Sequence, residues 1–187
     1  MELADWAEDI ARTILQVPLP RRWAHTQGVA AQAFTLKPIL GKDTDLLAAA
    51  AWLHDIGYAP DLVDTGFHPL DGARYLRDVH QADPVLCSLV AHHSFAMTEA
   101  SERGVASELA AEFSMPPGRL LAMLTYSDLT TSPDGERVSV TWRLADIRAR
   151  YGPDHLIARG FARAMPQIAA VVETVLYARC GRSTPAR

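Results

Sequence analysis

Helical periodicity dominates this chain, and two of its most apolar segments end in side chains that suit a metal better than a core. DLLAAAAWLHDIG is rich in Ala and Leu and leads into His54 and Asp55, and PVLCSLVAHHS leads into His92 and His93. Imidazoles and carboxylates are costly to bury without partners. A shared metal centre would explain them, because a metal neutralises carboxylates and occupies imidazole lone pairs.

Single histidines and a further aspartate on other segments complete this set. Its members are His25, His54, Asp55, His68, His92, His93 and Asp128. Neighbouring residues on a helix point about 100° apart, so a pair in a final turn can present two splayed donors. Five imidazoles and two carboxylates without a thiolate favour Fe, Mn, Zn, Co or Ni over Mg or Ca. We therefore predict two adjacent divalent transition-metal ions.

The fold class predicted from the pattern is all-α, since no strand–turn–strand pattern stands out. With 187 residues, 49% of them hydrophobic, the chain suits one all-helical domain over 1–187. We expect a core over about 20–132, with C-terminal helices over 139–179 packing on it and a frayed RCGRSTPAR tail. The helices are expected over about 3–16, 20–36, 45–57, 69–79, 84–94, 98–113, 118–129, 139–150 and 154–178.

Net charge and composition limit the binding partners that we expect. A net charge of -4 gives no overall basic field, so we expect no nucleic acid partner. No run approaches the roughly 18 apolar residues of a membrane span, so no membrane partner is expected either. Cys87 and Cys180 form no CxxC pair, and the acidic start lacks the features of a signal peptide. We therefore expect a cytoplasmic protein, while a homo-oligomer stays open.

The order His25, His54-Asp55, Asp128 resembles the H…HD…D signature of the HD-domain metal-dependent phosphohydrolase superfamily. AAAAWLHDIG is similar to that family's apolar helix ending in HDIG, and TYSDLTT to its final Asp segment. The likeness runs from about Arg22 to Thr131. It implies a single HD-domain-like helical bundle.

Two further pieces, HPLDGARYL and AHHS, resemble the extended histidine set of the binuclear members. These include the HD-GYP cyclic dinucleotide phosphodiesterases and the HD-type diadenosine tetraphosphate hydrolases. The resemblance implies that one metal is held by His25, His54, Asp55 and Asp128. It implies that the second metal is held by His68, His92 and His93, with Asp55 bridging the two.

The implied reaction is hydrolysis of a phosphoester or phosphoanhydride bond in a small phosphorylated metabolite, with a nucleotide as the expected substrate. His54 and Asp55 would form the catalytic centre, and a hydroxide bridging the metals would be the nucleophile. Two departures are visible. Tyr58 replaces the lysine of HDIGK, so a fixed positive charge beside the metals is missing. The glycine-tyrosine-proline element is absent, which argues against cyclic dinucleotides.

Three side chains are candidate substrate contacts. Arg22 lies one helical turn before His25 and could grip a phosphate, or it could be a solvated surface residue. Tyr58 could line the pocket or pack against apolar neighbours. Arg74 could approach the substrate, although a salt bridge to Asp71 or Asp78 is the competing interpretation.

Two other functions stay open on sequence grounds. Some binuclear HD relatives are mixed-valent di-iron oxygenases, and the ligand count suits them equally. A sensor that binds a nucleotide without turnover is the third class. The ligands alone do not identify the substrate, the metal or the oligomeric state.

Overall fold

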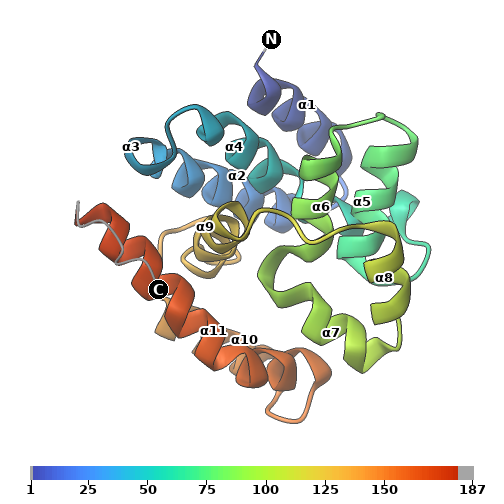
Figure 1. Ribbon diagram of the computed structural model, residues 1–187. Coiled ribbons are helices and arrows are strands. Elements are labelled where there is room, and N and C mark those ends of the chain that lie inside the picture. Colours follow the sequence, from blue (N-terminus) through green and yellow to red (C-terminus); the bar gives the residue numbers. More distant parts are fainter. Residues whose placement is uncertain (1, 181–187) are drawn as a thin grey trace.

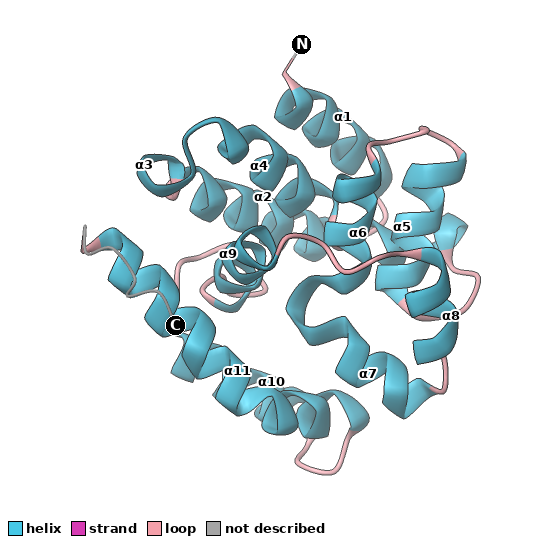
Figure 2. Ribbon diagram, in the orientation of Figure 1, coloured by secondary structure: helices cyan, strands magenta, loops and turns pink. Residues whose placement is uncertain are grey.

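The computed structural model describes residues 2–180, which fold into helices joined by short loops (Figure 2). Within this part of the chain no strand is assigned, and an isolated bridge pairs Thr131 with Arg137. The all-α prediction is confirmed. The α-helices are α1 Leu3–Leu15, α2 Pro20–Phe34, α3 Lys37–Leu40, α4 Thr44–Leu53, α5 His68–Asp78, α6 Pro84–His92, α7 Ala96–Arg103, α8 Ala106–Glu112, α9 Gly118–Leu129, α10 Val140–Tyr151 and α11 Leu156–Arg179. Short 3-10 turns are η1 Gly41–Asp43, η2 Ile56–Tyr58, η3 Pro60–Leu62 and η4 His93–Phe95.

The boundaries differ from the sequence prediction in three places. The helix expected over 98–113 is two helices, α7 and α8, because Gly104 adopts a φ of 79° that ends α7. The third expected helix stops at Leu53 rather than at Gly57, and the short helix α3 was not predicted. Most of the tail expected to fray, from 181 onward, lies outside the described residues.

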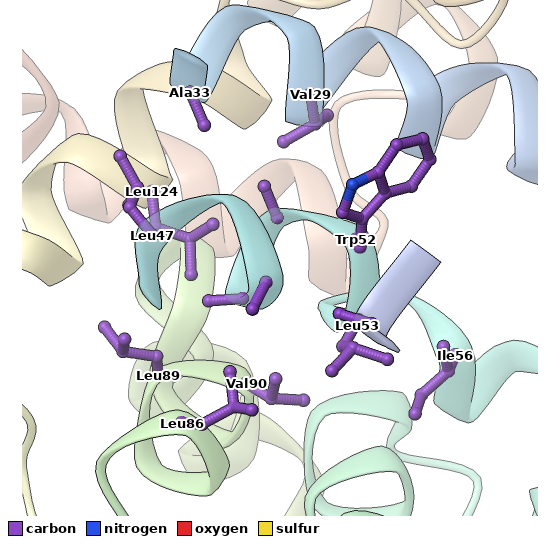
Figure 3. Packing of buried hydrophobic residues seen from close by; sticks show 14 of the residues in the cluster. Val29, Ala33, Leu47, Trp52, Leu53, Ile56, Leu86, Leu89, Val90 and Leu124 are labelled. Carbon is purple, nitrogen blue, oxygen red and sulfur yellow. The ribbon is translucent and has the colours of Figure 1, made fainter. Parts of the chain in front are cut away.

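The apolar helix α4 occupies the centre of the bundle (Figure 1). It packs against α1, α2, α6 and α9, and every residue from Leu47 to Leu53 is buried. Its alanines let neighbouring helices approach closely. Trp52 stacks on Trp23 of α2 with ring centroids 5.4 Å apart. Figure 3 shows Leu53 of α4 in the same core as Leu86, Leu89 and Val90 of α6. Full burial of a leucine stabilises a fold by about 1.5–3 kcal/mol, so this helix fixes where its C-terminal His54 and Asp55 lie.

The C-terminal helices α10 and α11 lie together at the edge of the bundle (Figure 1). They pack on each other, and α11 contacts α7 and α9. A small second cluster of buried apolar side chains joins Leu129 of α9 to Ala164 and Ile168 of α11. This packing places α10 beside the end of α9, where Asp128 lies. Among the described residues no helix has the length and apolar character needed to cross a membrane.

Candidate metal centre

Several helix ends meet at one place in the bundle and carry the predicted ligands there. His25 lies in α2, His54 and Asp55 follow α4, and Asp128 is near the end of α9. Six of the seven predicted side chains form two compact groups, in each of which the ligand atoms all lie within 4.8 Å of one another. The first group is His25, His54 and Asp128; the second is Asp55, His68 and His93.

Asp55 belongs to the second group and also faces the first. Its Oδ2 is 3.3 Å from Nε2 of His54 and 3.9 Å from Nε2 of His25. Its Oδ1 is 3.4 Å from Nε2 of His68 and 3.8 Å from Nε2 of His93. One carboxylate therefore presents a separate oxygen to each group, as a bridging ligand must.

The hydrogen bonds of three histidines orient their lone pairs into the cluster. The Nδ1 atoms of His25, His54 and His93 lie 2.9, 2.7 and 2.7 Å from backbone carbonyl oxygens. A carbonyl can only accept, so each Nδ1 carries a hydrogen, and in the neutral imidazole that binds a metal each Nε2 then has the lone pair. Among the described residues, Nε2 of His54 is buried and has no hydrogen-bond partner. This is how metal-ligating imidazoles are held, so the donor set fits a transition metal.

The electrostatics of the first group favour a cation. Burial lowers the pKa of His54, but the Asp55 and Asp128 carboxylates raise it, and the net direction is upward. Burial raises the pKa of Asp55, yet Arg22 and His54 bring it well below its usual range. The pKa of Asp128 is likewise lowered, because hydrogen bonding and charge from His25 outweigh burial. Both carboxylates therefore stay ionised and require positive charge nearby.

The second group is ready to coordinate at neutral pH. Burial, together with the neighbouring His54 and His68, lowers the pKa of His93 to about 3. Burial also lowers the pKa of His68, against the opposing effect of Asp55. Both imidazoles are therefore neutral at pH 7, which is the form that binds a metal.

Arg22 and Tyr58 form the wall beside Asp55. Nη1 of Arg22 lies 2.7 Å from Oδ2 of Asp55, and the guanidinium carbon lies 4.0 Å from the centre of the Tyr58 ring. Tyr58 in turn stacks on His68 with ring centroids 3.8 Å apart. The positive charge that appeared to be missing when Tyr58 replaced lysine is thus supplied by Arg22 from α2. Both side chains line a pocket together with predicted ligands of both groups.

Sequence comparison agrees with this geometry. The sequence profile of the HD domain family matches residues 22–130, more than half of the chain. This chain belongs to the HD domain family. The described HD domain includes both groups of ligands, and their His and Asp side chains are consistent with metal binding.

Comparisons with curated proteins and with solved structures give less information about the family. The chain is 36% identical over 70 residues to ribonuclease Y of Rubrobacter xylanophilus. That match covers 37% of this chain and 14% of the relative, so the similarity is confined to a small part of the longer protein. No solved structure matches the chain.

His92 is the predicted ligand that the structure does not bring into either group of the HD domain. It is buried, and its Nε2 lies 2.8 Å from the carbonyl oxygen of Phe113. Its Nδ1 is also buried and has no hydrogen-bond partner in the described structure. His92 ends α6 and His93 begins η4, so the two neighbours point in different directions and His93 alone joins His68.

Arg74 is the predicted substrate contact that lies away from the pocket. Its Nε is 3.1 Å from Glu112 and its Nη1 is 3.4 Å from Asp64, and it also pairs with Glu108. Arg74 therefore forms structural salt bridges, as the alternative interpretation held, but not with the expected partners Asp71 or Asp78. Asp71 instead accepts hydrogen bonds from the backbone of residues 64–66.

The close approach of two glycines positions His68. A Cβ at Gly57 would lie 2.1 Å from the carbonyl oxygen of His68 and 2.6 Å from the backbone nitrogen of Gly72. No real side chain fits there, so Gly57 lets the start of α5 lie directly against η2. The sequence pattern had assigned Gly57 to ending a helix; its observed role is this backbone contact.

Further site residues were missed by the sequence analysis. Ser94 donates a hydrogen bond to Oδ2 of Asp128 from a backbone turn with a φ of 48°. Arg143 of α10 is buried and its Nη2 lies 3.8 Å from Oδ1 of Asp128. Arg150 of α10, which belongs to no sequence motif singled out above, also lines the pocket. One signal was available: Arg143 is four residues from Ile147, so both lie on one face of the helix.

Proposed function

We propose that this HD domain is a metal-dependent phosphohydrolase that cleaves a phosphoester or phosphoanhydride bond of a small phosphorylated metabolite, with a nucleotide as its preferred substrate. The observation that carries the proposal is the position of Asp55. One of its oxygens faces His25 and His54, and the other faces His68 and His93. A carboxylate shared by two ligand groups is what a pair of adjacent cations requires.

The residues divide naturally between two ions. His25, His54 and Asp128 would hold one, His68 and His93 the other, and Asp55 both. Bound divalent transition metals supply an acidified water at neutral pH and stabilise the charge of the attacking and leaving oxygens. The absence of thiolates from these groups is compatible with Fe, Mn, Zn, Co or Ni.

The chain's own side chains account for phosphate binding. Arg22 presents a guanidinium at the metal pocket, and it stays charged because the Asp55 carboxylate raises its pKa against the effect of burial. A guanidinium can grip two phosphate oxygens at once. Arg143 faces the pocket from the side of Asp128. Water attacks phosphorus, the bond to the leaving oxygen breaks, and that oxygen takes up a proton.

The lining of the pocket supports a nucleotide substrate. Beyond the arginines, Ile147, Tyr151 and Phe161 line the side formed by α10 and α11. Their apolar and aromatic surfaces suit a nucleoside, which supports the choice of a nucleotide.

The test combines metal analysis with a phosphate-release screen. The purified full chain is analysed for metals and then assayed with that metal on mononucleotides, dinucleotides, sugar phosphates and a short oligoribonucleotide. We expect bound transition metal and release of phosphate from a nucleotide. The oligoribonucleotide is included because of the similarity to a protein named ribonuclease Y.

Two outcomes would count against the proposal. Metal-loaded protein that consumes oxygen and releases no phosphate from the panel would favour an oxygenase. Metal-loaded protein that binds nucleotides and never cleaves them would favour a sensor.

A further inference from the structure

A second hollow continues outward from the metal pocket, between the N-terminal end of α2 and helix α10. It shares with the metal pocket four lining residues: Arg22, His25, Arg143 and Arg150. The two hollows therefore meet along a wall of three arginines and one predicted metal ligand. We refer to the second hollow as the arginine groove.

The charge of the arginine groove has one sign. Arg21 joins the three shared arginines in its lining, and the remaining lining residues are prolines, a leucine and His25. None of the described residues that line it is acidic. Arg21 itself pairs with Asp134 at 2.8 Å, with both side chains largely exposed.

Arg143 is incompletely satisfied where the two hollows meet. It is 8% exposed, and its Nε is buried without a hydrogen-bond partner in the described structure. Its Nη1 lies 3.4 Å from Asp146, and its Nη2 lies 3.8 Å from Asp128. Leaving a buried charged donor unpaired is costly, so the site is best explained by a ligand that supplies acceptor oxygens.

Arg150 shares its carboxylate partner with Arg143. Its Nη2 is 2.8 Å from Oδ2 of Asp146, the same oxygen that faces Arg143. One carboxylate oxygen thus serves two guanidinium groups, which leaves unused N–H donors on this face of α10. A phosphate group carries several acceptor oxygens and matches those donors.

We propose that the arginine groove binds a second phosphate of the substrate, linked to the one at the metal centre. Arg22 contacts Asp55, and Arg143 faces Asp128, so an anion in the groove lies directly beside both ligand groups. The substrate class is therefore a compound with two or more linked phosphates, such as a nucleoside diphosphate. This inference rests on the proposed function. Arg143 and Arg150 lie beyond the segment that matches the HD family profile, so the specificity comes from this chain's own α10.

The experiment measures binding of two non-hydrolysable probes to the metal-loaded full chain by calorimetry. Methylenediphosphonate carries two linked phosphonates, and methylphosphonate carries one. We expect the first to bind at least tenfold more tightly than the second in the unchanged protein. In Arg150→Gln that advantage should fall to about threefold or less. Arg148→Gln is the matched control, because Arg148 is an exposed arginine of the same helix outside both hollows.

Metal content is measured before and after each titration, so that loss of metal to the diphosphonate is recognised. Arg143→Lys serves as a second variant that keeps the charge and should reduce the advantage as well. An advantage that is absent, or equal in Arg150→Gln and Arg148→Gln, would overturn the inference while leaving hydrolysis of monophosphates intact. An Arg150-dependent advantage without hydrolysis of any phosphate would retain the arginine groove and overturn the proposed function.

Discussion

The guanidinium of Arg22 is bonded to Asp55 through Oδ2, the carboxylate oxygen that also faces His25 and His54. The pair is short, at 2.7 Å, and Asp55 is almost fully buried. Arg22, the proposed phosphate contact, therefore donates to the Asp55 oxygen that would face one metal ion. The proposed roles of the two residues can be separated only by comparing variants of each.

Replacement of Asp55 should impair both metal binding and phosphate release. Asp55→Asn removes the carboxylate that serves both ligand groups, so we expect less than half of the bound metal to remain. Phosphate release should fall by more than about 100-fold, since loss of an outer partner alone can cost 10–100-fold. Elemental analysis and a phosphate-release assay measure these effects. Asp134→Asn makes the same charge change at an exposed position and should alter neither quantity. Retained hydrolysis in Asp55→Asn would contradict the proposed function.

Arg22 and Arg21 offer a second matched comparison. Arg22→Gln removes the guanidinium beside Asp55, and kcat/KM for the substrate should fall by about 10–100-fold. Arg21 is the adjacent residue, but it pairs with exposed Asp134, so Arg21→Gln should change kcat/KM by less than about threefold. Steady-state kinetics on both variants measure the difference. Equal losses in the two would show that general positive charge, and not the Arg22 contact, is what matters.

Variants of the adjacent residues His92 and His93 should distinguish a metal ligand from a structural histidine. His93→Gln should lose about one of two metal equivalents, because Nε2 of His93 belongs to the second group. His92→Gln should keep both equivalents and instead lower the free energy of unfolding by about 1–3 kcal/mol, since it disturbs a buried hydrogen bond to Phe113. Metal analysis and thermal unfolding of both variants provide the readouts. Loss of metal in His92→Gln would restore this residue to the ligand set.

Gly57 is expected to be intolerant of any side chain. Gly57→Ala places a Cβ against the backbone of His68 and Gly72, which should cost about 1–3 kcal/mol of unfolding free energy or more. It should also weaken metal binding, because α5 carries His68. Gly118 begins α9, and a Cβ there would meet no atom of another part of the chain within 4 Å, so Gly118→Ala should be neutral or slightly stabilising. Chemical denaturation of both variants is the test, and a Gly57→Ala protein as stable as Gly118→Ala would contradict it.

The ion-pair network of Glu112 predicts a pH dependence of stability away from the site. Hydrogen bonds from Arg74 and Arg77 lower the pKa of Glu112 from its ordinary 4.5 to about 2. A carboxyl whose folded pKa is lowered stabilises the fold above pH 4.5, and this stabilisation is lost as the pH falls toward 2. The free energy of unfolding of Glu112→Gln should therefore be lower than that of the unchanged protein by roughly 1 kcal/mol or less at about pH 6, because the network is partly exposed. The difference should vanish near pH 2; a difference that grows on acidification would refute this account.

Local pattern was enough to predict the helical class and six of the side chains that the structure brings together in two groups. Apolar periodicity is a property of a dozen neighbouring residues, so the buried helix α4 was visible without any long-range contact. The same holds for the chemistry at its end. His54 and Asp55 could be identified as candidate ligands because the apolar segment before them leaves such groups without an ordinary role. Helix breaks such as the one at Gly104 were harder to predict, since a single glycine in the sequence does not by itself indicate a left-handed turn.

The direction of individual side chains was decided only when the helices packed. His93 and His92 are neighbours in sequence, yet the end of α6 turns the first toward His68 and the second toward Phe113. Arg74 pairs with acidic residues of α8 and lies away from the pocket, whereas α10 places Arg143 beside Asp128. Both positions depend on how helices far apart in the sequence pack. Residue types and helix faces are local, and the convergence of helix ends into one site is a property of the whole bundle.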